Sequence, residues 1–196
     1  MRHHTIISGT GRAGTTLLVR VLTRAGLDTG FTPETFPIDP VSAGGLELDI
    51  REPGCPTIVK SPWIASYIGE VLADPTIAID HAIICMRDLY SAAESRRRVQ
   101  RVAGDAREAW SGLFMTRRAK DQERVLAELF HQLIFHLTAH NVPLTFLHFP
   151  RFARDAEYLA DTLRPVFPSL SRTALTAALR AEVSPELIHT FPAPAG

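Results

Sequence analysis

One stretch decides the fold of this 196-residue chain: Thr5-Ile6-Ile7-Ser8-Gly9-Thr10-Gly11-Arg12-Ala13-Gly14-Thr15-Thr16. Its apolar start predicts a short strand, and its three glycines predict a tight turn directly after that strand. Apolar residues then recur at the spacing of one helix face: Leu17, Leu18, Val21, Leu22 and Ala25. The order strand, glycine-rich turn, helix is the beginning of an α/β domain.

The turn has the G-x4-G spacing of a P-loop, counted from Gly9 to Gly14. In such a loop, backbone N–H groups at a helix N-terminus hold an anion. Thr15 stands where nucleotide-hydrolysing loops have lysine, and Arg12 supplies the cation instead. This favours a ligand with one terminal anionic group over a triphosphate–metal complex. A strand-to-helix turn without a ligand is the structural alternative.

Further periodic segments complete the fold prediction. Short apolar runs predict strands at 57–60, 81–86 and 143–149. Amphipathic patterns predict helices at 62–73, 88–102, 105–140, 153–167 and 171–181. The alternation indicates an α/β, three-layer P-loop fold with a mainly parallel central sheet flanked by helices. We expect one domain over 1–196 with a helical insertion at about 96–140.

Composition limits the class of protein. Hydrophobic residues make up 45% and charged residues 21%, as in a globular protein. Lys+Arg and Asp+Glu are both 21, so the net charge is zero and nucleic acid is not an expected partner. No apolar run has the roughly 18 residues of a membrane span. Two cysteines without a disulfide or zinc pattern favour the cytoplasm, and the eight histidines show no metal-ligand spacing.

Two regions outside the glycine-rich turn attract attention. Arg87 follows the strand predicted at 81–86, and Ser95 comes eight residues later. On a helix of about 1.5 Å rise per residue, their Cα atoms lie within about 12 Å, so both side chains can reach one anion. A strand-end arginine and an exposed serine are the alternative. Residues 27–56 form a long connection with one short helix, and connections of that length are typical of function.

Arg12-Ala13-Gly14-Thr15-Thr16, together with Arg87 and Ser95, resembles the two signatures of the P-loop sulfotransferases. That family transfers a sulfuryl group from 3′-phosphoadenosine 5′-phosphosulfate (PAPS) without a metal. The resemblance implies these donor-binding residues: Gly11, Arg12, Ala13, Gly14, Thr15, Thr16, Arg87 and Ser95. It also implies that the 3′-phosphate lies at Arg87 and Ser95. A second group on the following helix offers further cations for it: Arg96, Arg97, Arg98 and Arg101.

The resemblance also suggests catalytic residues and has gaps. Lys60 matches a lysine that the family often has after its second strand, but Pro62 stands where cytosolic members have a catalytic histidine. Arg12 and Lys60 are the expected catalytic cations. Glu34, in the long connection, is the expected base, with His148 as a second candidate.

The acceptor is expected to be a hydroxyl or amine on a small molecule or a glycan. The sequence identifies neither the acceptor nor the oligomeric state. Two other functions stay open: an atypical P-loop nucleotide kinase or NTPase, and a non-catalytic nucleotide-binding relative.

Overall fold

The computed structural model describes residues 1–103, 112–189 and 191. Its centre is a four-stranded sheet of order β4-β1-β5-β6, in which every neighbouring pair is parallel. The strands are β1 (Arg2–Gly9), β4 (Ile58–Lys60), β5 (Ile77–Met86) and β6 (Leu144–His148). The predicted α/β fold with a parallel central sheet is confirmed.

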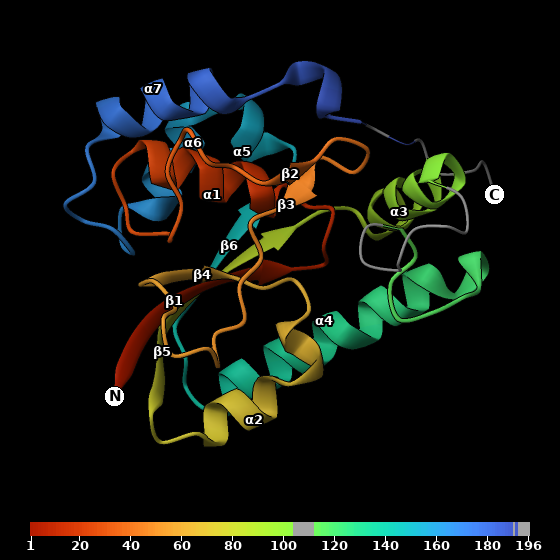
Figure 1. Ribbon diagram of the computed structural model, residues 1–196, viewed down its shortest axis with the longest axis horizontal. Coiled ribbons are helices and arrows are strands. Elements are labelled where there is room, and N and C mark those ends of the chain that lie inside the picture. The colour runs from red at the N-terminus through yellow and green to blue at the C-terminus, as the bar shows by residue number, and fades with distance from the viewer. Residues whose placement is uncertain (104–111, 190, 192–196) are drawn as a thin grey trace.

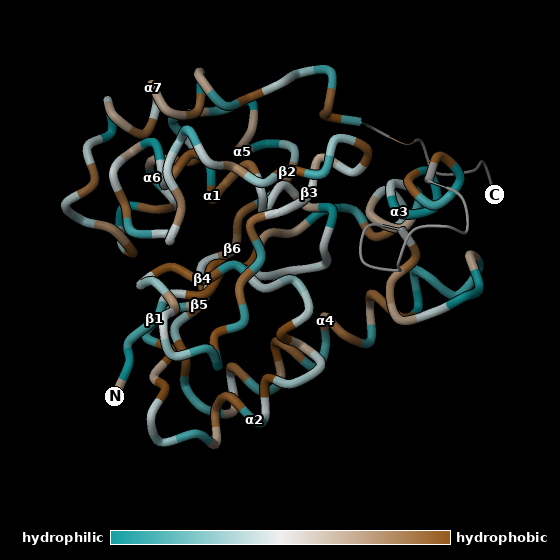
Figure 2. The backbone as a smooth tube through the Cα atoms, viewed as in Figure 1, coloured by the Kyte–Doolittle hydropathy of each residue, from teal (hydrophilic) through white to brown (hydrophobic). Residues whose placement is uncertain are grey.

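Helices cover both faces of the sheet (Figure 1). One face carries α1 (Thr15–Arg24), α5 (Arg151–Arg154), α6 (Ala156–Leu163) and α7 (Arg172–Glu182). The other carries α2 (Ile68–Ala73) and α4 (Gln122–Ala139). Side chains of a strand alternate between the two faces, so Ile83 packs under α1 and Ile84 over α4. Figure 2 shows the resulting hydrophobic colour along the central strands.

The carboxyl ends of the strands all point toward α3 (Leu89–Ala103) (Figure 1). The glycine-rich turn follows β1 and α3 follows β5, and these two strands are neighbours at the centre of the sheet. Ligands of open parallel sheets bind at this edge, where loops from neighbouring strands meet. The topology therefore brings the Gly9–Thr16 turn and the Arg87–Ser95 segment together.

The prediction of one continuous helix over 105–140 is wrong for residues 112–118. Residues 112–118 are not helical; a 3-10 turn at η2 (Ala119–Asp121) leads into α4, while 105–111 lie outside the described residues. The buried Gln122 side chain explains the difference. Its Oε1 accepts from the Phe114 backbone N–H at 2.6 Å, and its Nε2 donates to the Phe114 carbonyl at 3.2 Å. This pair ties the preceding chain back against the start of α4.

Three other predicted elements differ in detail. The helix predicted at 62–73 is a 3-10 turn, η1 (Ile64–Ser66), followed by α2, with the break at Tyr67. The helix predicted at 153–167 is divided into α5 and α6 at Asp155, whose side chain caps α6 by accepting from the Tyr158 N–H.

The long connection holds no helix. It forms a small antiparallel hairpin of β2 (Ile38–Asp39) and β3 (Gly44–Gly45).

We expect Gly9→Ala to lower the free energy of unfolding by more than about 2 kcal/mol. Gly9 ends β1 with φ +145°, and an added Cβ would collide with the carbonyl oxygen of Cys85 on β5. Gly26→Ala is the matched control, because Gly26 has φ +92° and nothing within 4 Å of an added Cβ. It isolates the backbone penalty, about 1 kcal/mol. Equal losses in urea unfolding would contradict the steric account.

Candidate functional site

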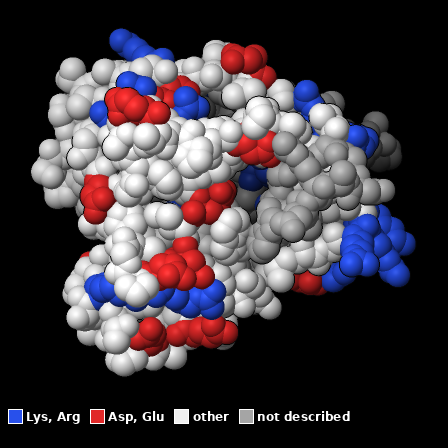
Figure 3. Space-filling model, in the orientation of Figure 1, with Lys and Arg blue, Asp and Glu red and all other residues white. Residues whose placement is uncertain are grey.

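A cavity of about 590 Å³ opens at the carboxyl edge of the sheet. This volume is typical of sites that enclose a small-molecule ligand. Its walls come from the glycine-rich turn, α1, the β2–β3 hairpin, the ends of β4 and β5, α3 and the chain that follows α7. Figure 3 shows Lys or Arg atoms inside a hollow of this face, with Asp or Glu atoms near its rim.

The turn after β1 has the shape of an anion cradle. Gly11, Arg12 and Gly14 have φ of +68°, +55° and +78°, all in the left-handed region. Successive residues of this kind turn their N–H groups toward one point. Gly14 precedes α1 without a side-chain cap, so the first-turn N–H groups of α1 remain directed at the cavity. An added Cβ at Gly14 would lie 2.6 Å from Cδ2 of Phe149, so this position needs glycine.

The structure brings the two predicted arginine motifs together. The Arg12 Nε donates to the Ser95 Oγ at 3.1 Å, across 83 residues of sequence. The Arg87 Nη1 donates to the Arg12 carbonyl oxygen at 2.9 Å. Seven of the eight residues predicted to bind the donor line the cavity: Gly11, Arg12, Gly14, Thr15, Thr16, Arg87 and Ser95. The eighth, Ala13, is fully buried and packs in the core below the turn.

Arg96 is the one member of the predicted arginine group that lines the cavity. Its Nη1 donates to the Gly112 carbonyl at 3.1 Å, and its guanidinium lies 4.8 Å from the Phe114 ring centroid. The buried Nε has no hydrogen-bond partner in the described part of the chain. Arg97 and Arg101 are instead paired with carboxylates outside the cavity. The sequence suggested this group of four arginines, but it gave no signal that Arg96 is the member that lines the cavity.

Four arginines line the cavity: Arg12, Arg20, Arg87 and Arg96. Arg20 is paired with Glu182, whereas Arg12, Arg87 and Arg96 concentrate positive charge in a partly buried space. Burial, followed by the charge of Arg12, lowers the pKa of Arg87 to about 10 and that of Arg96 to about 9. Burial also lowers the pKa of Arg12, opposed by Asp39 and Glu47. The hydrogen bonds described for these guanidinium groups go to a hydroxyl and to backbone carbonyls. A bound anion would therefore relieve a repulsion that the protein itself leaves.

Lys60 lies at the end of β4, beside the turn. Its side chain is 2% exposed, and its Nζ donates to the Thr16 Oγ1 at 2.8 Å, the Gly45 carbonyl at 2.6 Å and the Glu47 carboxylate at 2.6 Å. Burial lowers the pKa of Lys60, and Glu47 opposes that shift. Lys60 thus joins the turn, the hairpin and Glu47 in one hydrogen-bonded unit on the cavity wall.

The structure does not bring the two predicted bases to the cavity. Glu34 is exposed on the turn at 32–35, and His148 is exposed at the end of β6; neither lines the cavity. Glu47 does line it. The sequence shows Glu47 only as one of several acidic residues in the long connection. Its place depends on the Leu48 N–H donating to the Lys60 carbonyl, which holds this segment alongside β4.

No family model, no curated protein and no solved structure matches this chain. Over the described ranges, no helix is long and apolar enough to cross a membrane. The same residues contain no cluster of three or more His, Cys, Asp or Glu able to hold a metal. Fold and site together define an α/β protein with an arginine-rich cavity at the carboxyl edge of a parallel sheet.

Proposed function

We propose that this protein is a sulfotransferase that uses PAPS as sulfuryl donor. The observation that carries the proposal is the convergence of Arg12, Arg87 and Ser95 on one left-handed, glycine-rich turn. These are the residues on which the resemblance to P-loop sulfotransferases rests, and they come from two separate motifs. The topology alone places the two segments at one edge of the sheet, and the Arg12–Ser95 hydrogen bond goes beyond it because it joins two specific motif side chains.

Each part of the cavity has a distinct task in this proposal. The turn amides with Thr15 and Thr16 bind the 5′-phosphosulfate, because they provide N–H and O–H donors at a helix N-terminus. Arg87 and Ser95 bind the 3′-phosphate. A guanidinium suits this task because its planar donors match phosphate oxygens. PAPS carries two separated anionic groups, and the cavity offers cations to both.

The reaction is an in-line transfer of one sulfuryl group. The bond between sulfur and the bridging oxygen of the phosphosulfate breaks, and a bond from sulfur to the acceptor oxygen or nitrogen forms. Negative charge develops on the bridging oxygen, where Arg12 and Lys60 stabilise it. The acceptor proton passes to a carboxylate, and adenosine 3′,5′-bisphosphate leaves. We propose Glu47 as this carboxylate, since it lines the cavity and is held by Lys60.

The acceptor is proposed to be a small molecule with a hydroxyl or amine. The cavity wall also contains apolar side chains outside the C-terminal segment, which suit a compact organic body: Leu17 and Pro37. The polar acceptor group would then lie toward Glu47 and the turn.

We expect Glu47→Gln to lower turnover by about 100-fold or more, because a positioned base contributes about 10²–10⁴ in rate. Glu34→Gln is the matched control in the same connection, and its turnover is expected to equal that of the wild type. The assay follows transfer of labelled sulfur from PAPS to a panel of phenols, hydroxysteroids and aryl amines.

Three outcomes separate the alternatives. Loss in Glu34→Gln with full activity in Glu47→Gln would reverse the assignment of the base. Bound donor without transfer to any acceptor would favour the non-catalytic relative. Phosphoryl transfer from ATP with magnesium would favour the kinase.

A further inference from the structure

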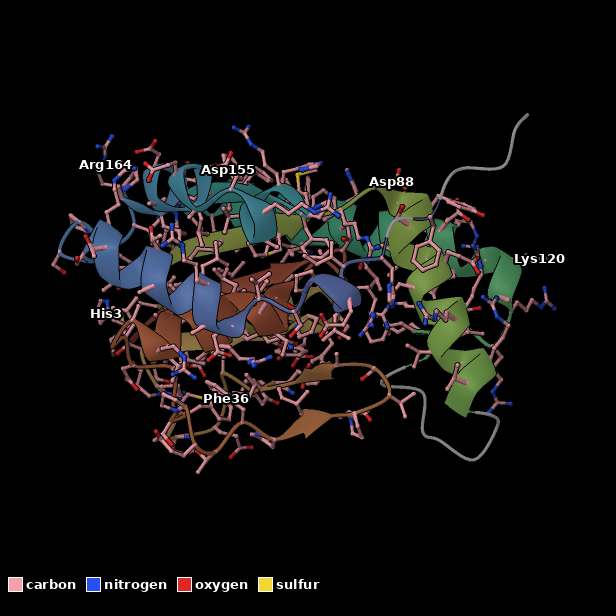
Figure 4. The ribbon with its side chains drawn as sticks, turned by 90° about the horizontal axis from the view of Figure 1, so that it is seen from above. His3, Phe36, Asp88, Lys120, Asp155 and Arg164 are labelled. Carbon is pink, nitrogen blue, oxygen red and sulfur yellow. The ribbon has the colours of Figure 1, made fainter. Side chains whose placement is uncertain are left out.

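The chain that follows α7 crosses the cavity and ends at the beginning of α3. We call residues 183–189 together with Phe191 the C-terminal strap. It contains η3 (Pro185–Leu187), and four of its residues line the cavity: Val183, Ser184, Leu187 and Ile188. Figure 4 shows it passing from α7 toward the start of α3, where Asp88 is labelled. The strap therefore reaches the site from the opposite end of the sequence.

The strap holds Arg87 directly. The Arg87 Nη2 donates to the backbone carbonyl of His189, and its guanidinium carbon lies 5.7 Å from the centroid of the Phe191 ring. The Ser91 Oγ donates to the Phe191 carbonyl at 3.3 Å, and the His189 and Phe191 rings are in edge contact. Arg87 also lies 5.2 Å from the ring of Phe149. Its guanidinium is thus enclosed by two aromatic rings and two backbone carbonyls.

We propose that the C-terminal strap is an internal competitor for the anion site and that a phosphate displaces it from Arg87. The inference rests on the proposed function to the extent that Arg87 binds the 3′-phosphate. An N–H that donates to the His189 carbonyl is not free to donate to a phosphate oxygen. The strap therefore uses part of the donor set of Arg87, whereas the turn remains open to the cavity.

The exchange favours the phosphate on electrostatic grounds. Both bonds have the ionised guanidinium as donor, but a phosphate adds an ionised acceptor and can take two parallel N–H···O bonds. At Arg87 the strap offers only a carbonyl dipole and ring faces. Burial, followed by the charges of Arg98, Arg87 and Arg12, lowers the pKa of His189, so its ring is neutral near pH 7. Displacement also removes Leu187, a residue that is 51% exposed, from the cavity wall.

The strap lowers the apparent affinity for the nucleotide by the fraction of molecules in which it occupies Arg87. Loosening the strap should therefore tighten binding. Phe191→Ala removes its two ring contacts and leaves Arg87 and the turn intact. We expect this variant to bind adenosine 3′,5′-bisphosphate about three- to tenfold more tightly than the wild type in calorimetry. The control is Phe146→Ala, an exposed phenylalanine on β6 outside the cavity, with unchanged affinity expected.

A second measurement follows the strap itself. Full-length protein carrying 4-fluorophenylalanine at position 191 is titrated with the bisphosphate and, separately, with sodium sulfate, and fluorine NMR reports on the ring beside Arg87. If the strap is displaced, the fluorine resonance of residue 191 is expected to shift and to sharpen once the protein is saturated with the bisphosphate.

Weaker or unchanged bisphosphate binding by Phe191→Ala would overturn the proposal that the strap competes for Arg87. It would not contradict the proposed donor site. A resonance that shifts with sulfate but not with the bisphosphate would support displacement of the strap by an anion and contradict binding of the nucleotide at Arg87. A resonance moved by neither anion would overturn the strap.

Discussion

Arg87→Ala is expected to weaken binding of adenosine 3′,5′-bisphosphate by about 10- to 100-fold. Hydrogen bonds to charged groups contribute about 1.5–3 kcal/mol, and about 1.4 kcal/mol is a factor of ten in Kd. Arg87 is half-buried and lies next to Arg12, and burial, followed by the charge of Arg12, lowers its pKa. Its loss therefore removes a cation that ligand binding would stabilise.

Two variants make this result specific. Arg101→Ala removes an arginine from the same helix that is 63% exposed and paired with Glu94, so its affinity for the bisphosphate is expected to match the wild type. Arg87→Lys keeps the charge and loses the planar pair of donors, so an intermediate Kd is expected. Unchanged Kd in Arg87→Ala, or equal losses in Arg87→Ala and Arg101→Ala, would show that Arg87 does not bind the ligand.

Lys60→Met should have the largest combined effect on stability and activity. Removing one partner of a buried ion pair costs about 3–5 kcal/mol, because the other charge is left unpaired. Lys60 is 2% exposed and Glu47 23%, so the lower end of that range applies to the free energy of unfolding. Loss of the cation beside the developing charge lowers kcat by about 10²–10³.

The double variant Lys60→Met/Glu47→Gln separates the two effects. Urea unfolding should show that it regains part of the lost stability, since the unpaired carboxylate is gone, while kcat stays at least as low as in Lys60→Met. Lys120→Met is the control, because Lys120 is the other lysine of the chain and lies exposed in η2. A double variant no more stable than Lys60→Met would contradict the ion-pair account.

Sequence reasoning succeeded where local pattern determines structure. The strand, glycine-rich turn and helix at the N-terminus follow from apolar periodicity and from backbone conformations that Gly11 and Gly14 adopt with little strain. The helix predicted after Arg87 is also present, and α3 places Ser95 within hydrogen-bond distance of Arg12 in the turn. In these cases, residues close in sequence carry the information.

Sequence reasoning failed where contacts between residues far apart in the sequence determine the structure. The Phe114 segment leaves the helical path because a single glutamine, Gln122, satisfies both its N–H and its carbonyl. Glu47, rather than Glu34, reaches the cavity because its segment lies along β4. The strap contacts Arg87 across 102 residues. Periodicity carries no signal for any of these contacts.

The most direct test of the donor site is calorimetric titration of the wild-type protein with adenosine 3′,5′-bisphosphate, beside ATP and GTP, each with and without magnesium. We predict tight binding of the bisphosphate that is the same with and without the metal and stronger than that of either triphosphate. Binding of ATP or GTP only with magnesium, and none of the bisphosphate, would contradict the account and place the protein among the P-loop kinases or NTPases.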